Sequence, residues 1–166
     1  MLYSLLISFV DQFTFLNVFK YLTFRTGLSL ISSMMIVFLI GGPFIKYFSQ
    51  RKITGPIRED GPIDHIFKKV GTPTMGGILI LIGMLLSTLL WADLSNVYIW
   101  VLIFIASSFG ILGAIDDYLK IKNNNSAGLS WSLKIIVQII LAFIGIYFLS
   151  KFADHSYLKN FYFPFF

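Results

Sequence analysis

Cysteine is absent from this 166-residue sequence, and charged residues make up only 13% of it. Without cysteine, the chain has no disulfide framework, no thiolate metal site and no cysteine nucleophile. The low charge and the 57% hydrophobic content are atypical of a soluble domain and suit lipid as the solvent. The net charge of +5 does not indicate nucleic-acid binding, because the lysines and arginines are confined to short stretches between apolar runs.

Four uncharged apolar runs have about the length that a helix needs to cross the hydrocarbon core of a bilayer. They predict an all-α, polytopic transmembrane protein that forms a single integral-membrane domain over residues 1–166. The segment up to Phe24 is apolar but interrupted by polar residues, which favours an interfacial helix over a cleaved signal peptide. The predicted spans lie near residues 26–45, 72–92, 97–115 and 135–150.

The distribution of positive charge between the runs predicts the orientation of the chain, because cytoplasmic loops carry an excess of lysine and arginine. The second connection, near residues 93–96, has neither. We therefore expect the amino terminus and this turn to be external, and the first and third connections to be cytoplasmic. The residues behind this prediction are Lys46, Arg51, Lys52, Arg58, Lys68 and Lys69 in the first connection, and Lys120, Lys122 and Lys134 in the third.

Asp116 and Asp117 are adjacent at the predicted cytoplasmic end of the third span. Adjacent carboxylates repel each other, and near the carboxyl end of a helix they also face its negative pole. A cation should therefore lie close by, either a lysine or a divalent metal. Magnesium typically takes one or two carboxylates together with substrate phosphates. A solvated acidic boundary at the end of a span is the alternative.

A second candidate site is the segment GTPTMGG at residues 71–77, which opens the second span just after Lys69. The hydroxyls of Thr72 and Thr74 and the amides near Gly76 and Gly77 are groups that can receive an anion at the start of a helix. The segment lacks the Gly-Lys-Ser/Thr sequence of a nucleotide P-loop. The alternative is an ordinary helix cap beside interfacial lysines.

These motifs, taken in order, resemble the bacterial phospho-N-acetylmuramoyl-pentapeptide-transferase family. The resemblance implies an inner-membrane enzyme that transfers phospho-N-acetylmuramoyl-pentapeptide from UDP-MurNAc-pentapeptide to undecaprenyl phosphate with Mg²⁺, forming lipid I and UMP for peptidoglycan synthesis. The matching pieces are REDGP at 58–62, Lys69 with GTPTMGG, WADLSN at 91–96, DDYLK at 116–120, and Gly128, Leu129 and Lys134.

The same resemblance implies roles for individual residues. Asp116 and Asp117 match paired aspartates beside the metal and the lipid phosphate, and one of the two has been proposed as a base. Lys69 matches an essential basic residue near the phosphates. The substrate-binding candidates are Thr72, Thr74, Gly76 and Gly77, which shape the cytoplasmic motif, and Lys120, Lys122 and Lys134, which are looser candidates for nucleotide or phosphate contacts.

Members of that family are longer than this chain and have further cytoplasmic loops that complete the site. We therefore expect these residues alone to be incomplete for catalysis, with a second chain or a homodimer left open as partner. Two alternatives remain: a non-catalytic membrane subunit or remnant, and an N-acetylglucosamine-1-phosphate transferase of the same superfamily. A transporter is disfavoured because the spans hold no charged residue near the bilayer midplane.

Overall fold

The computed structural model describes residues 2–51, 76–123 and 128–152. All regular secondary structure in these residues is helical, which confirms the all-α prediction. The elements are α1 (Leu2–Ser8), a 3₁₀ helix η1 (Thr14–Lys20), α2 (Leu22–Gln50), α4 (Gly76–Trp91), α5 (Val97–Lys122) and α6 (Trp131–Phe152).

Three of these helices, α2, α5 and α6, are long and apolar enough to cross a membrane. Each extends beyond the corresponding predicted span, which was bounded by the first charged residue on either side. The second predicted span, 72–92, is represented by α4, an apolar helix of 16 described residues. Its first four residues, 72–75, lie outside the described part of the chain. The structure therefore supports a multi-pass membrane protein.

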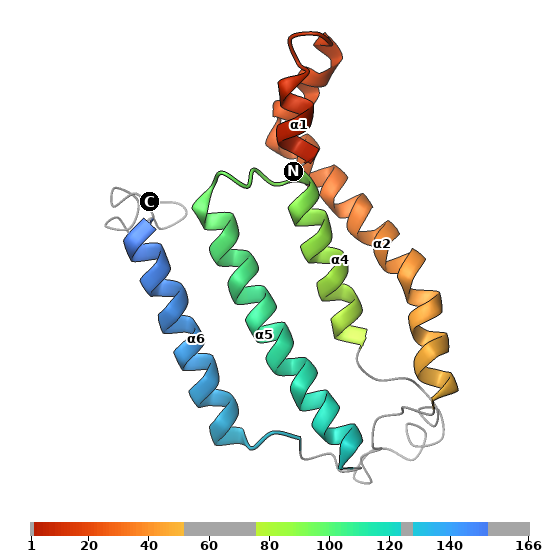
Figure 1. The fold of residues 1–166 in the computed structure, drawn as a ribbon, viewed down its shortest axis with the longest axis vertical. Coiled ribbons are helices and arrows are strands. Elements are labelled where there is room, and N and C mark those ends of the chain that lie inside the picture. Colours follow the sequence, from red (N-terminus) through yellow and green to blue (C-terminus); the bar gives the residue numbers. More distant parts are fainter. Residues whose placement is uncertain (1, 52–75, 124–127, 153–166) are drawn as a thin grey trace, which may run out of the picture.

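The helices α2, α4, α5 and α6 lie side by side in chain order and alternate in direction (Figure 1). α2 packs against α4, α4 against α5, and α5 against α6, so the helices form one open layer. The carboxyl ends of α2 and α5 and the amino ends of α4 and α6 lie at the same end of this layer. We call it the aspartate end, because it carries Asp116 and Asp117, and the opposite end, with the turn 92–96, the turn end.

Helices α2 and α4 approach each other closely at Gly83. A Cβ atom added there would lie 2.7 Å from Cγ2 of Val37 and 3.1 Å from the carbonyl oxygen of Ser33. Leu79, Gly83 and Ser87 are buried at intervals of four residues, so they form the face of α4 that contacts α2. Small residues at such a face let helix backbones pack tightly, which drives association where lipid removes the hydrophobic driving force.

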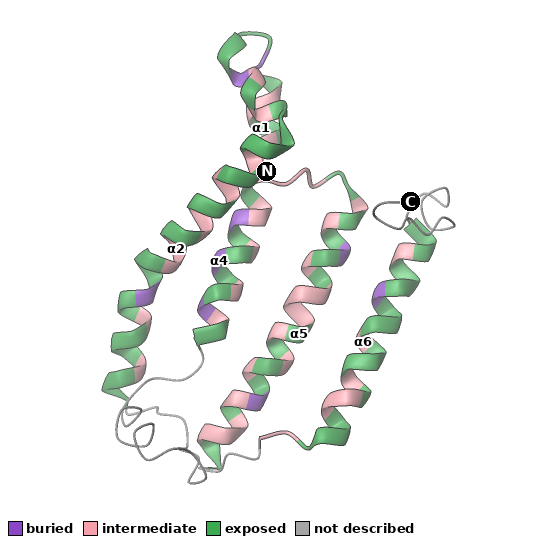
Figure 2. Ribbon diagram, turned by 180° about the vertical axis from the view of Figure 1, so that it is seen from behind, coloured by how far each residue is buried: buried purple, intermediate pink, exposed green. Residues whose placement is uncertain are grey.

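Most residues of the layer are exposed or half-buried (Figure 2). Large apolar side chains, among them Phe38, Leu102 and Phe143, are well exposed on the helices. Only four apolar side chains among the described residues are buried, namely Val10, Leu16, Leu79 and Val101. Such exposure would be costly in water and is ordinary in hydrocarbon, which agrees with the composition.

The amino-terminal segment differs from the single interfacial helix that the sequence predicted. It forms two short elements, α1 and η1, because the first helix ends at Ser8, shortly before the polar residues Asp11 and Gln12. Helices this short are marginal on their own and depend on tertiary contacts. One such contact places the guanidinium carbon of Arg25, on α2, 4.0 Å from the ring centroid of Tyr3, on α1.

Candidate active site at the aspartate end

Both carboxylate oxygens of Asp116 are engaged by positive charge. Lys120 Nζ lies 2.7 Å from Oδ2, and Lys134 Nζ lies 2.9 Å from Oδ1. The backbone N–H of Leu129 also donates a hydrogen bond to Oδ1, at 2.7 Å. Lys120 lies one turn farther along α5, whereas Lys134 belongs to the first turn of α6. Asp116 therefore connects the end of α5 to the start of α6.

Gly128 makes this connection sterically possible. Its φ is +58°, a conformation that side-chain-bearing residues rarely adopt. A Cβ atom at this position would also overlap Oδ1 of Asp116 and lie 2.9 Å from Cε of Lys120. From the sequence, Gly128 and Leu129 were recognised as motif residues, but no role was predicted for them. A glycine just before a helix start, downstream of an acidic pair, is the signal that was available.

Asp117 lies in a different environment from its neighbour. Its side chain is 38% exposed, compared with 13% for Asp116. Oδ1 is 3.5 Å from Lys120 Nζ, and Oδ2 has no partner among the described residues. Asp117 is consequently the carboxylate that is available to a ligand, while Asp116 is already neutralised by lysines.

The lysine contacts arise because α5 continues past the predicted end of the span at residue 115. It ends at Lys122, so Asp116, Asp117 and Lys120 share the final turns of one helix. Side chains three and four residues apart face each other on a helix, which brings Lys120 next to both aspartates. The predicted cation beside the acidic pair is therefore confirmed, and within the described residues it is lysine.

A cavity of about 370 Å³ opens between α4 and α5 beside the two aspartates. One part of its wall is polar and acidic, and the rest is apolar or backbone. This combination suits a molecule with a charged head and an apolar body. The lining residues are Gly77, Ile78, Ile80, Leu81, Met84, Gly110, Gly113, Ala114, Asp116 and Asp117.

The structure brings some of the predicted site residues together and leaves others apart. Asp116, Asp117, Lys120 and Lys134 form one cluster, and Gly77 lines the cavity beside it. Gly76 is exposed at the first position of α4, and Lys122 is exposed in the last turn of α5. Lys69, Thr72 and Thr74 lie outside the described residues.

The predicted magnesium site was assigned to Asp116 and Asp117. Within residues 2–51, 76–123 and 128–152, no group of three acidic, histidine or cysteine side chains could hold a metal ion. Asp117 has an oxygen without a partner among the described residues, and it fits the preference of Mg²⁺ for one or two carboxylates plus substrate phosphates. Asp116 fits less well, because a metal would have to displace its lysines. The assignment stays a prediction.

Taken together, the open layer of apolar helices and the charged cluster at its end define a polytopic membrane protein with a candidate phosphate site. Comparison with known proteins shows which family the chain is similar to. The pattern described as phospho-N-acetylmuramoyl-pentapeptide-transferase signature 1 matches residues 69–81. This stretch includes the predicted site residues Lys69, Thr72, Thr74, Gly76 and Gly77.

Two relatives extend the match along the chain. A phospho-N-acetylmuramoyl-pentapeptide-transferase of Pelagibacter ubique (strain HTCC1062) is 62% identical over 166 residues, which is 100% of this chain and 46% of the relative. One of Maricaulis maris (strain MCS10) is 44% identical over 147 residues, 88% of this chain and 40% of the relative. Over its whole length the chain is therefore similar to the amino-terminal part of a phospho-N-acetylmuramoyl-pentapeptide-transferase, and it carries a signature of that family. It spans less than half the length of either relative.

Proposed function

We propose that the chain takes part in transferring phospho-N-acetylmuramoyl-pentapeptide from UDP-MurNAc-pentapeptide to undecaprenyl phosphate, at the cytoplasmic face of the bacterial inner membrane. The products would be lipid I and UMP. The observation that carries this proposal is the 62% identity along the whole chain to a protein named for the reaction. The cluster of Asp116, Asp117, Lys120 and Lys134 supports placing the chemistry at the aspartate end.

Phosphoryl transfer needs positioning of two phosphate groups and neutralisation of their oxygen charge. An oxygen of the lipid phosphate attacks the sugar-linked phosphorus of the donor. The bond between that phosphorus and the bridging oxygen breaks, and its electron pair leaves with UMP. Lys120 and Lys134 carry the positive charge in the described part of the site. Asp116 holds both ammonium groups at 2.7 and 2.9 Å, so its role in this proposal is to position them.

Asp117 is the residue that we assign to the reacting groups. Its exposed carboxylate, with one oxygen unpartnered among the described residues, would hold Mg²⁺ together with substrate phosphates. The metal, when bound, would supply Lewis-acid stabilisation of the phosphate oxygens. Lys69 and the threonines of the signature, outside the described residues, would contribute further phosphate contacts.

The cavity between α4 and α5 supports a lipid as one of the two substrates. Its wall joins the carboxylates to the apolar side chains of Ile80, Leu81 and Met84. A lipid that keeps its tail among these residues would present its phosphate at the aspartate end. The soluble nucleotide substrate would reach the same end from the cytoplasm, as the lysine-rich connections predict.

The test is a chimera in which this chain replaces the amino-terminal part of the Pelagibacter ubique relative. Membranes containing the chimera, and membranes containing the chain alone, are assayed for lipid I with undecaprenyl phosphate, Mg²⁺ and labelled UDP-MurNAc-pentapeptide. We expect the chimera to make lipid I and Asp117→Asn in the chimera to reduce the rate by at least about a hundredfold, because a charge at the reacting centre is lost. Asp11→Asn, an exposed aspartate in the amino-terminal segment, is the matched control.

Three outcomes would contradict the proposal or its assignment of Asp117. A chimera that inserts in the membrane but makes no lipid I would favour a non-catalytic subunit. Transfer from UDP-N-acetylglucosamine in preference to UDP-MurNAc-pentapeptide would favour the other transferase of the superfamily. An Asp117→Asn chimera as fast as the Asp11→Asn control would remove Asp117 from the reaction.

A further inference from the structure

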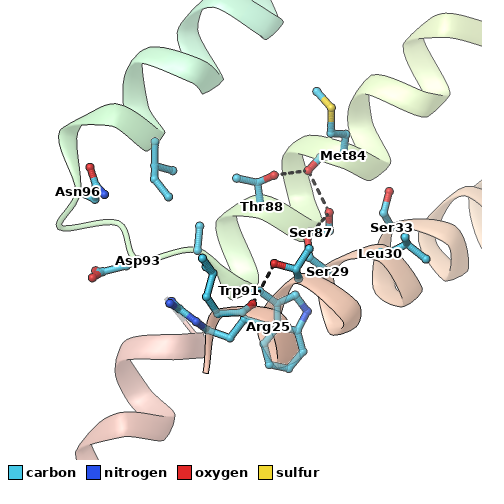
Figure 3. Close-up of a pocket in the computed structure, with 14 residues that line it drawn as sticks. Arg25, Ser29, Leu30, Ser33, Met84, Ser87, Thr88, Trp91, Asp93 and Asn96 are labelled. Carbon is cyan, nitrogen blue, oxygen red and sulfur yellow. Dashed lines mark hydrogen bonds between the residues drawn. The ribbon is translucent and has the colours of Figure 1, made fainter. Parts of the chain in front are cut away.

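A second cavity, of about 510 Å³, lies between α2 and α4 at the turn end of the layer (Figure 3). The first turns of α2 form one wall and the last turns of α4 the other, with the turn 92–96 closing one side. It is at the opposite end of the helices from Asp116 and Asp117. Nothing in the proposed transfer reaction uses this cavity.

Arg25 lines this cavity and carries a hydrogen-bond donor without a partner among the described residues. Its Nε is buried and has no hydrogen-bond partner among the described residues. Arginine stays protonated in proteins, so the buried atom belongs to a permanent positive charge. A buried donor without a partner is unfavourable, and a charged one more so. The contact of the guanidinium with the ring of Tyr3 holds the charge in place without satisfying Nε.

Asp93 lines the same cavity, and its negative charge interacts electrostatically with Arg25, but its hydrogen bonds are made to another residue. Its Oδ1 accepts hydrogen bonds from the hydroxyl of Ser95 at 2.7 Å and from the backbone N–H of Ser95 at 3.1 Å. The hydroxyl hydrogen bond is the main cause that lowers the pKa of Asp93, so the carboxylate remains ionised. Within the described part of the chain, Arg25 forms no ion pair with it. Figure 3 shows the Asp93 carboxylate directed away from the other labelled side chains.

The remaining polar groups of the cavity include further unused donors. The amide oxygen of Asn96 accepts from the N–H of Tyr98 at 2.9 Å, which leaves its NH₂ group free among the described residues. The hydroxyl of Ser33 likewise has no hydrogen-bond partner there. By contrast, the hydroxyls of Ser87 and Thr88 already donate to the carbonyl of Met84. A cavity with a fixed cation and free N–H and O–H donors is suited to an anion.

The position of the cavity identifies the kind of anion. Leu22, Leu30, Met84 and Ile99 line it together with the polar groups, at the ends of helices that are apolar along their length. Lipid phosphates lie at this depth, beside the ends of membrane-spanning helices. Orientation does not account for Arg25, because it lies at the turn end, which the charge distribution predicts to be external. We propose that this cavity binds the phosphodiester headgroup of an anionic membrane lipid, with Arg25 as its charge partner.

Trp91 lines the same cavity and provides a spectroscopic reporter. Its indole N–H donates to Oγ of Ser32 at 3.0 Å, and its ring stacks on Phe19, so its position is fixed. Replacing Trp100 and Trp131 with phenylalanine leaves Trp91 as the single tryptophan of the full chain. Phosphatidylcholine vesicles are then prepared with a rising fraction of either brominated phosphatidylglycerol or brominated phosphatidylcholine. The difference in Trp91 quenching between the two series measures how strongly the charged lipid is preferred.

We expect phosphatidylglycerol to be preferred, and Arg25→Gln to weaken this preference about tenfold, the factor that one charge-assisted hydrogen bond provides. Arg51→Gln is the matched control, because Arg51 also stacks on a tyrosine, at 4.4 Å from the ring of Tyr47, but lies at the aspartate end of the same helix. Its preference should equal that of the unaltered chain. Circular dichroism shows whether each variant keeps its helix content.

A second variant decides the matter if Arg25→Gln does not fold. Asp93→Asn removes a negative charge that lines the cavity and interacts with Arg25, and it should raise the preference for phosphatidylglycerol. Equal quenching by both lipids in the unaltered chain, or an unchanged preference in Asp93→Asn, would overturn the proposal. Inorganic phosphate added outside the vesicles tests whether the cavity binds free phosphate instead of a lipid headgroup. Displacement of the lipid by millimolar phosphate would show a site for free anions instead.

Discussion

The contacts of Asp116 and Asp117 predict that the two aspartates differ in their contribution to stability. Asp116 receives two lysines and one backbone N–H across the connection between α5 and α6. Asp117 receives one lysine at 3.5 Å and is much more exposed. Replacing either residue with asparagine keeps the shape and removes the charge. Asp116→Asn should therefore destabilise the fold, while Asp117→Asn should not.

The expected size of the difference follows from these contacts. A hydrogen bond to a charged group contributes about 1.5–3 kcal/mol, and an exposed ion pair about 0–1 kcal/mol. The lysine side chains at Asp116 are 29% and 32% exposed, which places their ion pairs between these limits. Asparagine can still accept the Leu129 N–H. We expect Asp116→Asn to lower the free energy of unfolding by about 2 kcal/mol and Asp117→Asn by less than about 0.5 kcal/mol.

Unfolding in mild detergent micelles by added sodium dodecyl sulfate, followed by circular dichroism, measures both values. A double-mutant cycle of Asp116→Asn with Lys134→Met isolates the ion pair between the two helices, and the pair should be non-additive by at least about 0.5 kcal/mol. Equal unfolding midpoints for the two asparagine variants would refute the assignment of Asp116 as the connecting residue. Additive behaviour in the cycle would refute the contact with Lys134.

Two further substitutions test the close approaches in the layer by the same unfolding measurement. Gly128→Ala should cost at least about 1–2 kcal/mol, because alanine at φ +58° is strained and its Cβ overlaps the Asp116 carboxylate. An unfolding free energy unchanged from that of the unaltered chain would contradict this. Gly83→Ala should cost about 1–3 kcal/mol, since its Cβ would lie 2.7 Å from Val37. Gly42→Ala, with nothing within 4 Å, is the control and should be neutral or stabilising.

Much of the fold could be predicted from the sequence, because a membrane span leaves a strong signal. Uncharged runs of sufficient length located α2, α5 and α6 and the described part of α4. The helix ends were less predictable. A span was taken to stop at the first charge, whereas α5 continues through Asp116 and Asp117 to Lys122. Charged side chains at a membrane edge are solvated, so nothing forces the helix to end there.

The residue types of the site could be predicted from the sequence, but the different roles of its two aspartates could not. An acidic pair requires a nearby cation, which the sequence argument expected to be either a lysine or a divalent metal, and among the described residues it is lysine. Which aspartate would receive it depended on the rotation of α5 relative to α6, which a local pattern does not encode. The role of Gly128 was missed for the same reason, because it depends on a carboxylate twelve residues earlier approaching its backbone. Arg25 was visible only as the boundary of a span.

An open layer in lipid changes where substitutions should matter. Apolar side chains such as Phe38 and Leu102 are exposed on the helices, and lipid hydrocarbon is as favourable an environment for them as a neighbouring helix would be. Burial of large side chains therefore contributes little to holding α2, α4, α5 and α6 together. The contacts that remain are close helix packing, as at Gly83, and the ion pairs of Asp116. Changes of size at the helix contacts and changes of charge at the aspartate end should accordingly disturb the fold more than apolar exchanges on its outward faces.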